Sequence, residues 1–358
     1  MTEKIRVAIV YGGRSAEHEV SVVSARCVME AIDPAKYDVV PVAITKEGRW
    51  LLPERKPAQL TAPAGSLPFV EEAGTTVALR PSAGLVSDSA DGSVDGLGAV
   101  DVVFPLVHGP FGEDGTLQGM LEMAGVPYVG AGVLASALGM DKEMQKRLFA
   151  ARGLPLAPWI HVHAADARRN EQGCTDTAVD QIGLPCFTKP ARLGSSVGVS
   201  RCRDAGEVRA GLAHAFEYDE KAIVEKAIVG RELECAVLGN DDPEASVVGE
   251  IVSANEFYDY RAKYLEEQSR TIVPADVAEP VAERVRRFAL EAFQAIECRG
   301  MARVDFFYEE ATGAVFLNEI NTIPGFTPIS MYPKLWDASG IPYAKLVDRL
   351  IELALEHR

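Results

Sequence analysis

Four polar side chains suited to chemistry lie in two neighbouring strand-like segments near the C-terminal end of the sequence. They are one arginine and three oxygen donors: Arg303, Asp305, Glu319 and Asn321. A short glycine-containing stretch separates segments 301–308 and 314–321, which predicts an antiparallel hairpin. If Tyr308 pairs with Ala314, all odd-numbered residues point to one face, where the four side chains meet. Even-numbered residues such as Phe316 then face the core.

The shared face of this hairpin has two interpretations. Two carboxylates and an amide oxygen are hard ligands that suit Mg²⁺, which shares its coordination shell with phosphate oxygens and water. The alternative is a solvated sheet face that carries a cross-strand ion pair between Arg303 and Glu319. The hairpin by itself leaves both interpretations open.

Lys189 precedes a loop rich in glycine and serine, residues 194–198. An ammonium group is costly to bury without an anion nearby. One interpretation is therefore that Lys189 binds phosphate, with the loop offering backbone N–H groups as an anion site. The alternative is a lysine whose tip reaches solvent beside an ordinary turn. No G-x-x-x-x-G-K-[ST] motif occurs in the sequence, which excludes a Walker-type phosphate site.

Three other features have plain structural interpretations. Residues 130–135 fit G-x-G-x-x-A, but no strand ending in Asp or Glu follows about 20 residues later, so we do not expect a dinucleotide site. Glu17 lies at the start of a predicted helix, where a carboxylate is usually a partner of the helix dipole. His161 and His163 lack a third metal ligand and are expected to be surface or hydrogen-bonded residues.

The composition is that of a globular protein with two or three domains. The chain has 358 residues, of which 47% are hydrophobic and 25% charged. Its 52 acidic and 36 basic residues give a formal charge of -16, which argues against a nucleic-acid partner. We expect no membrane segment and no signal peptide, and hence a cytoplasmic protein. The six cysteines include no C-x-x-C pair and are expected to be reduced thiols.

The order of predicted elements indicates the α/β class, with α+β character in the C-terminal part. Segments 5–32 and 100–125 each have a strand–turn–helix pattern, which implies a parallel sheet. Between them, 53–98 is rich in Pro, Ala, Gly and Ser and is predicted to be an irregular insertion or an elaboration of the sheet edge. A helix at 141–151, followed by Gly153 and nearby prolines, places a domain boundary near residue 140. Strand alternation resumes near 222, so we predict domains at 1–140, 141–222 and 223–358.

Taken in order, the motifs of this sequence resemble those of the D-alanine–D-alanine ligases, members of the ATP-grasp family. The matching segments are GGRSAEHEVS at 12–21, HGPFGEDGTLQGMLE at 108–122, PYVGAGVLASALGMDK at 127–142, KPARLGSSVGV at 189–199, FYDYRAKY at 257–264, and RVDFFY with NEINTIPGFTPISMYP within 303–333. Each motif alone is ambiguous, whereas the ordered series is specific. The resemblance implies an N-terminal substrate-binding domain and two further domains that clasp ATP between them.

The resemblance also implies roles for individual residues around the nucleotide. Phosphate contacts are implied for Lys142, Lys189, Ser196, Val197 and Lys263. Adenine and ribose contacts are implied for Glu225, Lys226, Ile228 and Glu232. Two Mg²⁺ ions, for which Mn²⁺ is an alternative, are implied at Asp305, Glu319 and Asn321.

At the amino-acid end, the resemblance implies that Glu17 binds the ammonium group of the first D-alanine and is linked through Ser195 to Tyr264. Arg303 and the Gly325 N–H would face the carboxylate of this substrate and the later oxyanion. Lys263 and Ser330, with the backbone near Met331, would receive the carboxylate of the second D-alanine. His108 matches a histidine that surrounds the active site in the family.

The implied reaction is the ATP-dependent ligation of two D-alanine molecules to D-alanyl-D-alanine for peptidoglycan precursors. It would proceed through an acyl phosphate and release ADP and phosphate, and the enzyme would be a homodimer. Residues 194–198 and 255–270 are expected to close over the site. Alternatives are a D-alanine–D-lactate ligase, another ATP-grasp carboxylate–amine ligase, or a non-catalytic nucleotide-binding protein on the same scaffold.

Overall fold

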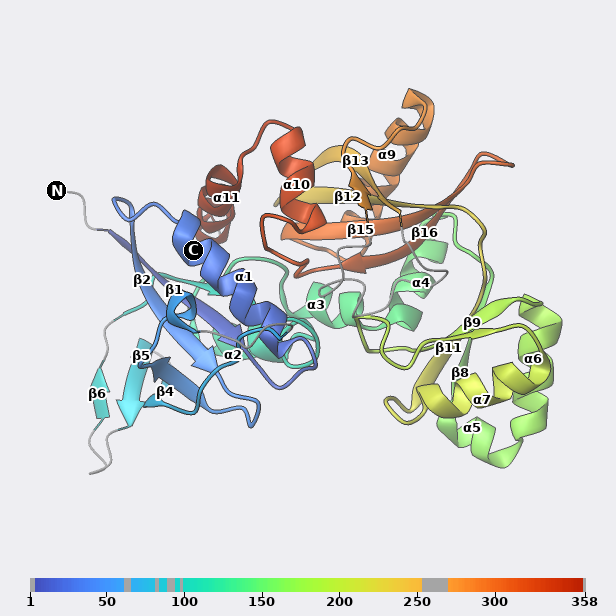
Figure 1. The fold of residues 1–358 in the computed structure, drawn as a ribbon, viewed down its shortest axis with the longest axis horizontal. Coiled ribbons are helices and arrows are strands. Elements are labelled where there is room, and N and C mark those ends of the chain that lie inside the picture. Colours follow the sequence, from blue (N-terminus) through green and yellow to red (C-terminus); the bar gives the residue numbers. More distant parts are fainter. Residues whose placement is uncertain are drawn as a thin grey trace.

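The computed structural model describes residues 4–60, 66–80, 84–88, 94–96, 99–252 and 270–356. These residues form three β-sheets, each drawn from a different part of the chain (Figure 1). The seven-stranded sheet lies at the left of the view, the five-stranded sheet at the upper right and the four-stranded sheet at the lower right. Within the described ranges, no helix is long and apolar enough to cross a membrane.

The N-terminal sheet has its strands in the order β6-β5-β4-β3-β2-β1-β7. Their bounds are β1 (Ile5–Gly12), β2 (Tyr37–Ile44), β3 (Trp50–Pro53), β4 (Gly74–Arg80), β5 (Gly84–Asp88), β6 (Val94–Gly96) and β7 (Val102–Pro105). β1 pairs in parallel with β2 and with β7, as the two strand–turn–helix segments predict. The remaining neighbours are antiparallel, so the sheet is mixed.

The stretch 53–98 extends this sheet at its edge. Its described residues form the short 3-10 helix η1 (Pro57–Gln59) and the strands β4 to β6. Of the two expectations for this stretch, an edge elaboration is confirmed and a wholly irregular insertion is wrong. Val77 and Val86 are buried at the centre of β4 and β5. Because so few apolar residues occur in these strands, the sequence lacks the alternation of apolar and polar residues that would have predicted them.

Helices from both ends of the chain cover the N-terminal sheet. α1 (His18–Ala31) packs on β1, and α11 (Tyr343–Leu355) packs against α1 and β7. α2 (Thr116–Ala124) ends at Gly125, whose φ of 68° is left-handed, as expected for a glycine that terminates a helix. α3 (Val133–Met140) and α4 (Lys142–Ala151) follow and lie against the C-terminal sheet.

The central sheet is antiparallel, with strands in the order β10-β9-β11-β8. Its elements are β8 (Trp159–His163), α5 (Ala164–Arg169), α6 (Glu171–Ile182), β9 (Cys186–Pro190), β10 (Ser200–Cys202), α7 (Ala205–Ala215) and β11 (Lys221–Lys226). α6 and α7 pack against the sheet and bury Val162, Val208, Leu212 and Val224. The boundary predicted near residue 222 falls within β11.

The C-terminal sheet is also antiparallel, with strands in the order β14-β13-β12-β15-β16. Its strands are β12 (Arg231–Gly239), β13 (Glu244–Val252), β14 (Arg270–Ile272), β15 (Gly300–Glu309) and β16 (Ala314–Asn321). α9 (Glu279–Ala295) covers one face, where Val304 and Phe306 are buried. α10 (Met331–Ala338) covers part of the other, where Met301 is buried, so Arg303 and Asp305 project on the side of α10.

The hairpin of β15 and β16 forms as predicted, but in a different register. Ala314 pairs with Glu309 and not with Tyr308, so the predicted pairing at the turn is wrong. A β-bulge then shifts the register by one residue, and Asp305 pairs with Glu319 beyond it. The shift at the turn and the shift at the bulge each move the pairing by one residue. Together they restore the predicted alternation of faces beyond the bulge, so the four polar residues still share a face.

The bulge changes which residues of β16 face the core. Val315 and Leu317, at 3% and 0% exposure, pack in the core beneath α9, whereas Phe316 is only half-buried. The prediction that Phe316 faces the core is therefore wrong, because positions before the bulge alternate in the opposite phase to those after it. Ile320, beyond the bulge, is buried as predicted.

Truncation of neighbouring residues on β16 tests this register. Leu317→Ala should lower the free energy of unfolding by about 2–5 kcal/mol, because it opens a cavity in a closed core. Phe316→Ala should cost less, although it removes more atoms. Urea denaturation followed by circular dichroism measures both. A larger loss in Phe316→Ala than in Leu317→Ala would support the register without a bulge.

Candidate active site

Arg303, Asp305 and Asn321 of the hairpin are joined by hydrogen bonds, and Glu319 lies opposite Asp305 on the paired strand. Arg303 binds both carboxylate oxygens of Asp305, with Nε–Oδ1 and Nη2–Oδ2 distances of 2.7 Å. It also lies 3.0 Å from the Glu234 carboxylate on β12. The Asn321 amide donates to Asp305 Oδ2 at 3.0 Å. Arg303 is only 7% exposed, so the interpretation as a solvated sheet face is wrong.

The charge of Arg303 is fixed by these carboxylates. Burial alone would lower the pKa of the guanidinium group, but Coulomb attraction to Asp305 and Glu234 outweighs burial and raises the pKa well above its ordinary value. Arg303 is thus a permanent, buried cation on the face of the sheet that also carries Asp305. It is suited to stabilising negative charge on a small bound anion.

Lys142 reaches the same group of residues from the first position of α4. Its Nζ lies 3.0 Å from Glu319 Oε2 and donates to the Leu193 carbonyl at 2.8 Å. The lysine therefore joins the hairpin to the segment just before the glycine–serine loop. A cavity lies at this junction, and its lining includes Gly109, Glu113, Lys142, Gly194, Glu319 and Asn321.

A buried triad of charges lies next to this junction. The Glu225 carboxylate of β11 accepts from Lys189 of β9 at 2.7 Å and from Lys146 of α4. Lys146 and Glu225 are each 2% exposed. The interpretation of Lys189 as a lysine that reaches solvent beside a turn is therefore wrong. The triad has a net charge of +1, which favours an anion at its open side.

Lys146 is a residue that the sequence analysis missed. It follows Lys142 by four positions, so both side chains lie on one face of α4. The sequence could have revealed Lys146 through this four-residue spacing. It could not have revealed the partner on β11, because Glu225 lies 79 residues away.

The two lysines determine the ionisation of Glu225. Burial would raise the pKa of this carboxyl group, but Lys146 and Lys189 lower it to about 2. Glu225 in turn raises the pKa of Lys189 against the effect of burial. Burial lowers the pKa of Lys146, the more enclosed lysine. The short contacts on all sides favour a fully ionised triad at neutral pH.

The glycine–serine loop is held in an unusual backbone conformation. Ser195, Ser196 and Gly198 have φ angles of 52°, 58° and 73°. Two successive non-glycine residues in the left-handed region are strained, a feature typical of binding loops. Within the loop, the Val197 N–H donates to the Gly194 carbonyl at 3.2 Å and the Val199 N–H to the Ser196 carbonyl at 3.3 Å.

Glu17 connects this loop to the N-terminal sheet. It occupies the N-cap position of α1, but its side chain makes no capping hydrogen bond. Its Oε1 instead accepts from the Ser195 hydroxyl at 2.5 Å. Glu17 is therefore not merely a partner of the helix dipole, because its carboxylate faces the site.

His108 and Glu113 both bind the backbone of Ile323, just after β16. His108 Nδ1 lies 3.1 Å from the Ile323 carbonyl, and Glu113 accepts from the Ile323 N–H at 3.0 Å. Glu113 also accepts from the Gly109 N–H at 2.6 Å. Burial, and then the charge of Glu17, raise the pKa of Glu113 to about 8. These contacts hold the loop that carries Gly325, and Glu113 was another residue missed from the sequence.

The residues predicted to bind the second substrate lie at the start of α10. Ser330 is the N-cap residue of this helix, and its Oγ accepts from the Thr327 N–H at 3.2 Å. A Cβ added to Gly325 would lie 3.1 Å from Ser330 Oγ, so these two residues are neighbours. The Met331 side chain is 5% exposed and belongs to the core, which leaves its backbone for binding.

The residues predicted to bind adenosine lie at the end of β11, in the connection after it and at the start of β12. The Glu225 carboxylate is engaged by two lysines, so its backbone is the part suited to adenine. Lys226 donates to the Leu184 carbonyl at 3.0 Å, and Ile228 is half-buried in the connection. Glu232 is close enough to Lys189 to raise the pKa of that lysine. Lys263 and Tyr264 lie outside the described residues, as does most of the predicted lid 255–270.

The donor set on the hairpin fits a divalent cation. Asp305 and Glu319 oppose each other across β15 and β16, and Asn321 contacts Asp305. The side chains of Asp305 and Glu319 are 15% and 24% exposed, and Glu319 and Asn321 line the cavity. Two carboxylates and an amide are the oxygen ligands that Mg²⁺ and Mn²⁺ accept. The carboxylates are at present balanced by Arg303 and Lys142.

The three sheets and the cation-lined junction between them are those of an ATP-grasp ligase. Family models of the D-ala D-ala ligase N-terminus and C-terminus match residues 6–131 and 148–352. The chain belongs to the D-alanine–D-alanine ligase family.

Individual relatives agree with this assignment over nearly the whole chain. D-alanine–D-alanine ligase of Geobacillus kaustophilus is 50% identical over 354 residues, which cover 99% of this chain and 95% of the relative. The solved D-alanine–D-alanine ligase of Coxiella burnetii superposes with a TM-score of 0.84 at 36% identity and covers 99% of this chain and 95% of its own. The VanG D-Ala:D-Ser ligase of Enterococcus faecalis also gives 0.84, at 34% identity over 98% of this chain and 100% of its own.

The pKa of Glu225 leads to a prediction about stability and pH. A carboxyl group whose pKa is lower in the folded protein stabilises the fold above its unfolded pKa, and this contribution is lost as the pH falls from about 5 towards 2. The depression corresponds to a contribution on the order of 3 kcal/mol. Glu225→Gln should therefore be less stable than the parent protein at pH 7, and the difference should shrink by pH 3.

Urea denaturation at both pH values measures this difference. Glu310→Gln serves as the control, because the Glu310 carboxylate is exposed in the hairpin turn and pairs only at the surface with Arg231. A stability difference for Glu225→Gln that stays constant between pH 7 and pH 3 would contradict the assigned ionisation.

Proposed function

We propose that this enzyme joins two D-alanine molecules to D-alanyl-D-alanine and converts ATP to ADP and phosphate. The observation that carries the proposal is the convergence of Lys142, the Lys189 triad and the glycine–serine loop on one junction. The paired carboxylates of the hairpin lie on one side of that junction, and Glu17 lies on the other. Phosphate-binding and amino-acid-binding chemistry therefore meet within reach of each other.

The triphosphate lies between the central and C-terminal sheets in this proposal. Lys142 and Lys189 bind its phosphates, and the loop with Ser196 and Val197 covers them. Adenine contacts the chain from Glu225 through Lys226 to Ile228, and Glu232 receives the ribose hydroxyls. The net positive charge of the triad supports this placement.

In the first step, the carboxylate of one D-alanine attacks the terminal phosphate to form an acyl phosphate. Two unit charges roughly 4 Å apart repel by about 4 kcal/mol at an effective dielectric of about 20. Lys189 and Arg303 offset this repulsion without having to reorganise, because their ion pairs already fix them in place, and Lys142 adds a third positive charge. Glu17 holds the ammonium group of the same substrate and so orients its carboxylate.

Asp305, Glu319 and Asn321 would hold divalent cations, Mg²⁺ or Mn²⁺, which when bound neutralise phosphate charge.

In the second step, the amine of the other D-alanine attacks the acyl carbon, and phosphate leaves from a tetrahedral intermediate. Arg303 and the Gly325 N–H stabilise the oxyanion of this intermediate. Ser330, the Met331 N–H and the positive end of α10 bind the carboxylate of the incoming substrate. Lys263 contributes to the same carboxylate, and Tyr264 completes the link from Glu17 through Ser195.

A ligase for a different second substrate is the alternative. Because the chain is similar to the VanG D-Ala:D-Ser ligase, D-serine is a candidate second substrate in addition to D-lactate. Tyr264 belongs to the predicted lid 255–270, and family analogy implies that this tyrosine favours an amine over a hydroxy acid as the second substrate.

Several sequence predictions accompany the proposal. They are the domain division at 1–140, 141–222 and 223–358, the homodimer, and the cytoplasmic role in making peptidoglycan precursors. Light scattering on the purified protein tests the homodimer.

Product analysis tests the proposed reaction directly. With ATP, Mg²⁺ and D-alanine, the enzyme should release ADP, phosphate and D-alanyl-D-alanine in equal amounts, as identified by mass spectrometry. Parallel reactions contain D-alanine with D-serine or with D-lactate. Formation of a mixed product in preference to D-alanyl-D-alanine would favour the alternative, and ATP binding without amino-acid-dependent ADP release would indicate a non-catalytic protein.

Asp305→Asn should lower kcat by roughly a hundredfold or more and raise the Mg²⁺ concentration needed for half-maximal rate. The substitution removes a charge that both orients Arg303 and belongs to the cation-binding set. Coupled measurement of ADP release over a Mg²⁺ titration reports both effects. Glu310→Gln, on the same hairpin but exposed, should behave like the parent enzyme. An unchanged Mg²⁺ dependence in Asp305→Asn would exclude Asp305 from the cation site.

A further inference from the structure

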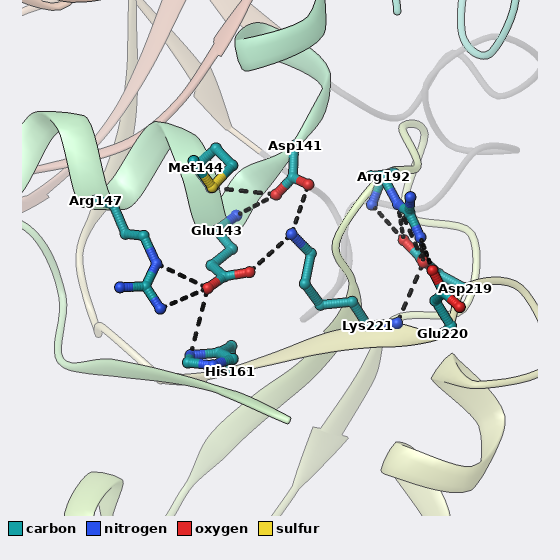
Figure 2. Close-up of polar contacts among 9 residues, drawn as sticks. All are labelled: Asp141, Glu143, Met144, Arg147, His161, Arg192, Asp219, Glu220 and Lys221. Atoms are coloured by element: carbon teal, nitrogen blue, oxygen red, sulfur yellow. Dashed lines mark hydrogen bonds and ion pairs between the residues drawn. The ribbon is translucent and has the colours of Figure 1, made fainter. Parts of the chain in front are cut away.

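A second network of charges lies beside the proposed phosphate site and is not explained by substrate binding. It joins the start of α4 to the central sheet (Figure 2). The residues are Asp141, Glu143, Arg147, His161 and Lys221. None of them is assigned a substrate in the proposed function.

Lys221, the first residue of β11, is the centre of this network. Its ammonium group lies 2.5 Å from Asp141 Oδ2 and 2.7 Å from Glu143 Oε2. These two carboxylates belong to the residues immediately before and after Lys142, the lysine proposed to bind phosphate. Figure 2 shows the Lys221 side chain extending between them. The Lys221 side chain is only 10% exposed, so its two ion pairs are largely shielded from water.

Asp141 has a second role in the same place. It is the N-cap residue of α4, and its Oδ1 accepts from the Glu143 and Met144 N–H groups at 3.1 Å. One carboxylate therefore begins the helix and also anchors it to Lys221. The direction in which Lys142 leaves the helix depends on this cap.

Backbone hydrogen bonds tie the same elements together. The Lys142 N–H donates to the Ala191 carbonyl, and the Ala191 N–H donates to the Lys221 carbonyl, both at 2.9 Å. Arg192 is held by Asp219, with a contact of 2.5 Å. The segment that leads into the glycine–serine loop is thus fixed to β11 and α4 together (Figure 2).

The charges predict what the loss of Lys221 would do. Asp141 and Glu143 would remain as two partly buried carboxylates that flank Lys142, with Arg147 still paired to Glu143 and Arg192 near Asp141. The two carboxylates would attract the Lys142 ammonium group away from Glu319 and the Leu193 carbonyl. They would also repel phosphate.

We propose that Lys221 is a positioning residue for phosphoryl transfer, which sets Lys142 against Lys189 and the glycine–serine loop by binding both neighbours of Lys142. The inference rests on the proposed function, because it takes Lys142 as a phosphate ligand. Lys221 itself does not touch the nucleotide.

Steady-state kinetics of Lys221→Met tests the inference. The KM for ATP should rise by about tenfold or more, while the KM for D-alanine at saturating ATP should change by less than about twofold. A purely structural role would reduce the amount of active enzyme without changing the KM for ATP. Lys36→Met is a control, because Lys36 also pairs with a carboxylate, Asp348, but lies at the surface in the turn before β2.

A double substitution separates positioning from packing. Adding Glu143→Gln to Lys221→Met removes one of the two carboxylates left beside Lys142 and should restore part of the lost ATP affinity. Losses that simply add would overturn the inference, as would an unchanged KM for ATP in a folded Lys221→Met enzyme.

If Lys221→Met does not fold, Asp141→Asn provides the test. Asparagine is an equally good N-cap residue, so α4 is retained while one ion pair to Lys221 is lost. The KM for ATP should again rise, and an unchanged value would overturn the inference. Failure of the parent enzyme to make D-alanyl-D-alanine would instead contradict the proposed function, so the two failures are distinguishable.

Discussion

The pairing of buried cations with carboxylates is the interaction on which the rest of this structure depends. An enzyme with a formal charge of -16 must bind a polyanion beside a carboxylate substrate. It does so by fixing positive charge locally, with Arg303 held by Asp305, Lys142 by Glu319 and Lys189 by Glu225. Each pair costs desolvation energy, and the cost is tolerable only because the geometry is tight and further hydrogen bonds complete it.

The arrangement of the sheets follows from that requirement. The carboxylates and arginine come from one hairpin, the lysines from α4 and β9, and Glu17 from the loop between β1 and α1. No single element could place these groups together, since a helix or hairpin fixes only residues a few positions apart. Contacts between the sheets therefore determine how accurately these groups are placed relative to one another. The Ser195–Glu17 hydrogen bond links the central and N-terminal parts, and His108 and Glu113 link the N-terminal and C-terminal parts.

The sequence predicted the elements well because each has a local signature. The α4 helix, its glycine terminator and the two strands of the hairpin are where periodicity placed them. Alternation also brought Arg303, Asp305, Glu319 and Asn321 to one face, although a β-bulge moved Phe316 out of the core. Lys146, Glu113 and Lys221 escaped prediction because their partners are 79, 210 and 80 residues away. Motif resemblance supplied their neighbours but gave no reason to select them.

The same pairs imply that nucleotide and divalent cation favour each other's binding. Lys142 is engaged with Glu319, so a phosphate that recruits this lysine leaves a carboxylate without its cation. A divalent ion held as proposed at Glu319 and Asp305 would supply the missing charge, and Lys142 would oppose it if no phosphate were present to draw the lysine away. Either ligand alone would replace one balanced pair by an unbalanced one, whereas the two together would leave both Lys142 and Glu319 with a partner of opposite charge. Such coupling is reciprocal, so each ligand raises the affinity for the other by the same factor.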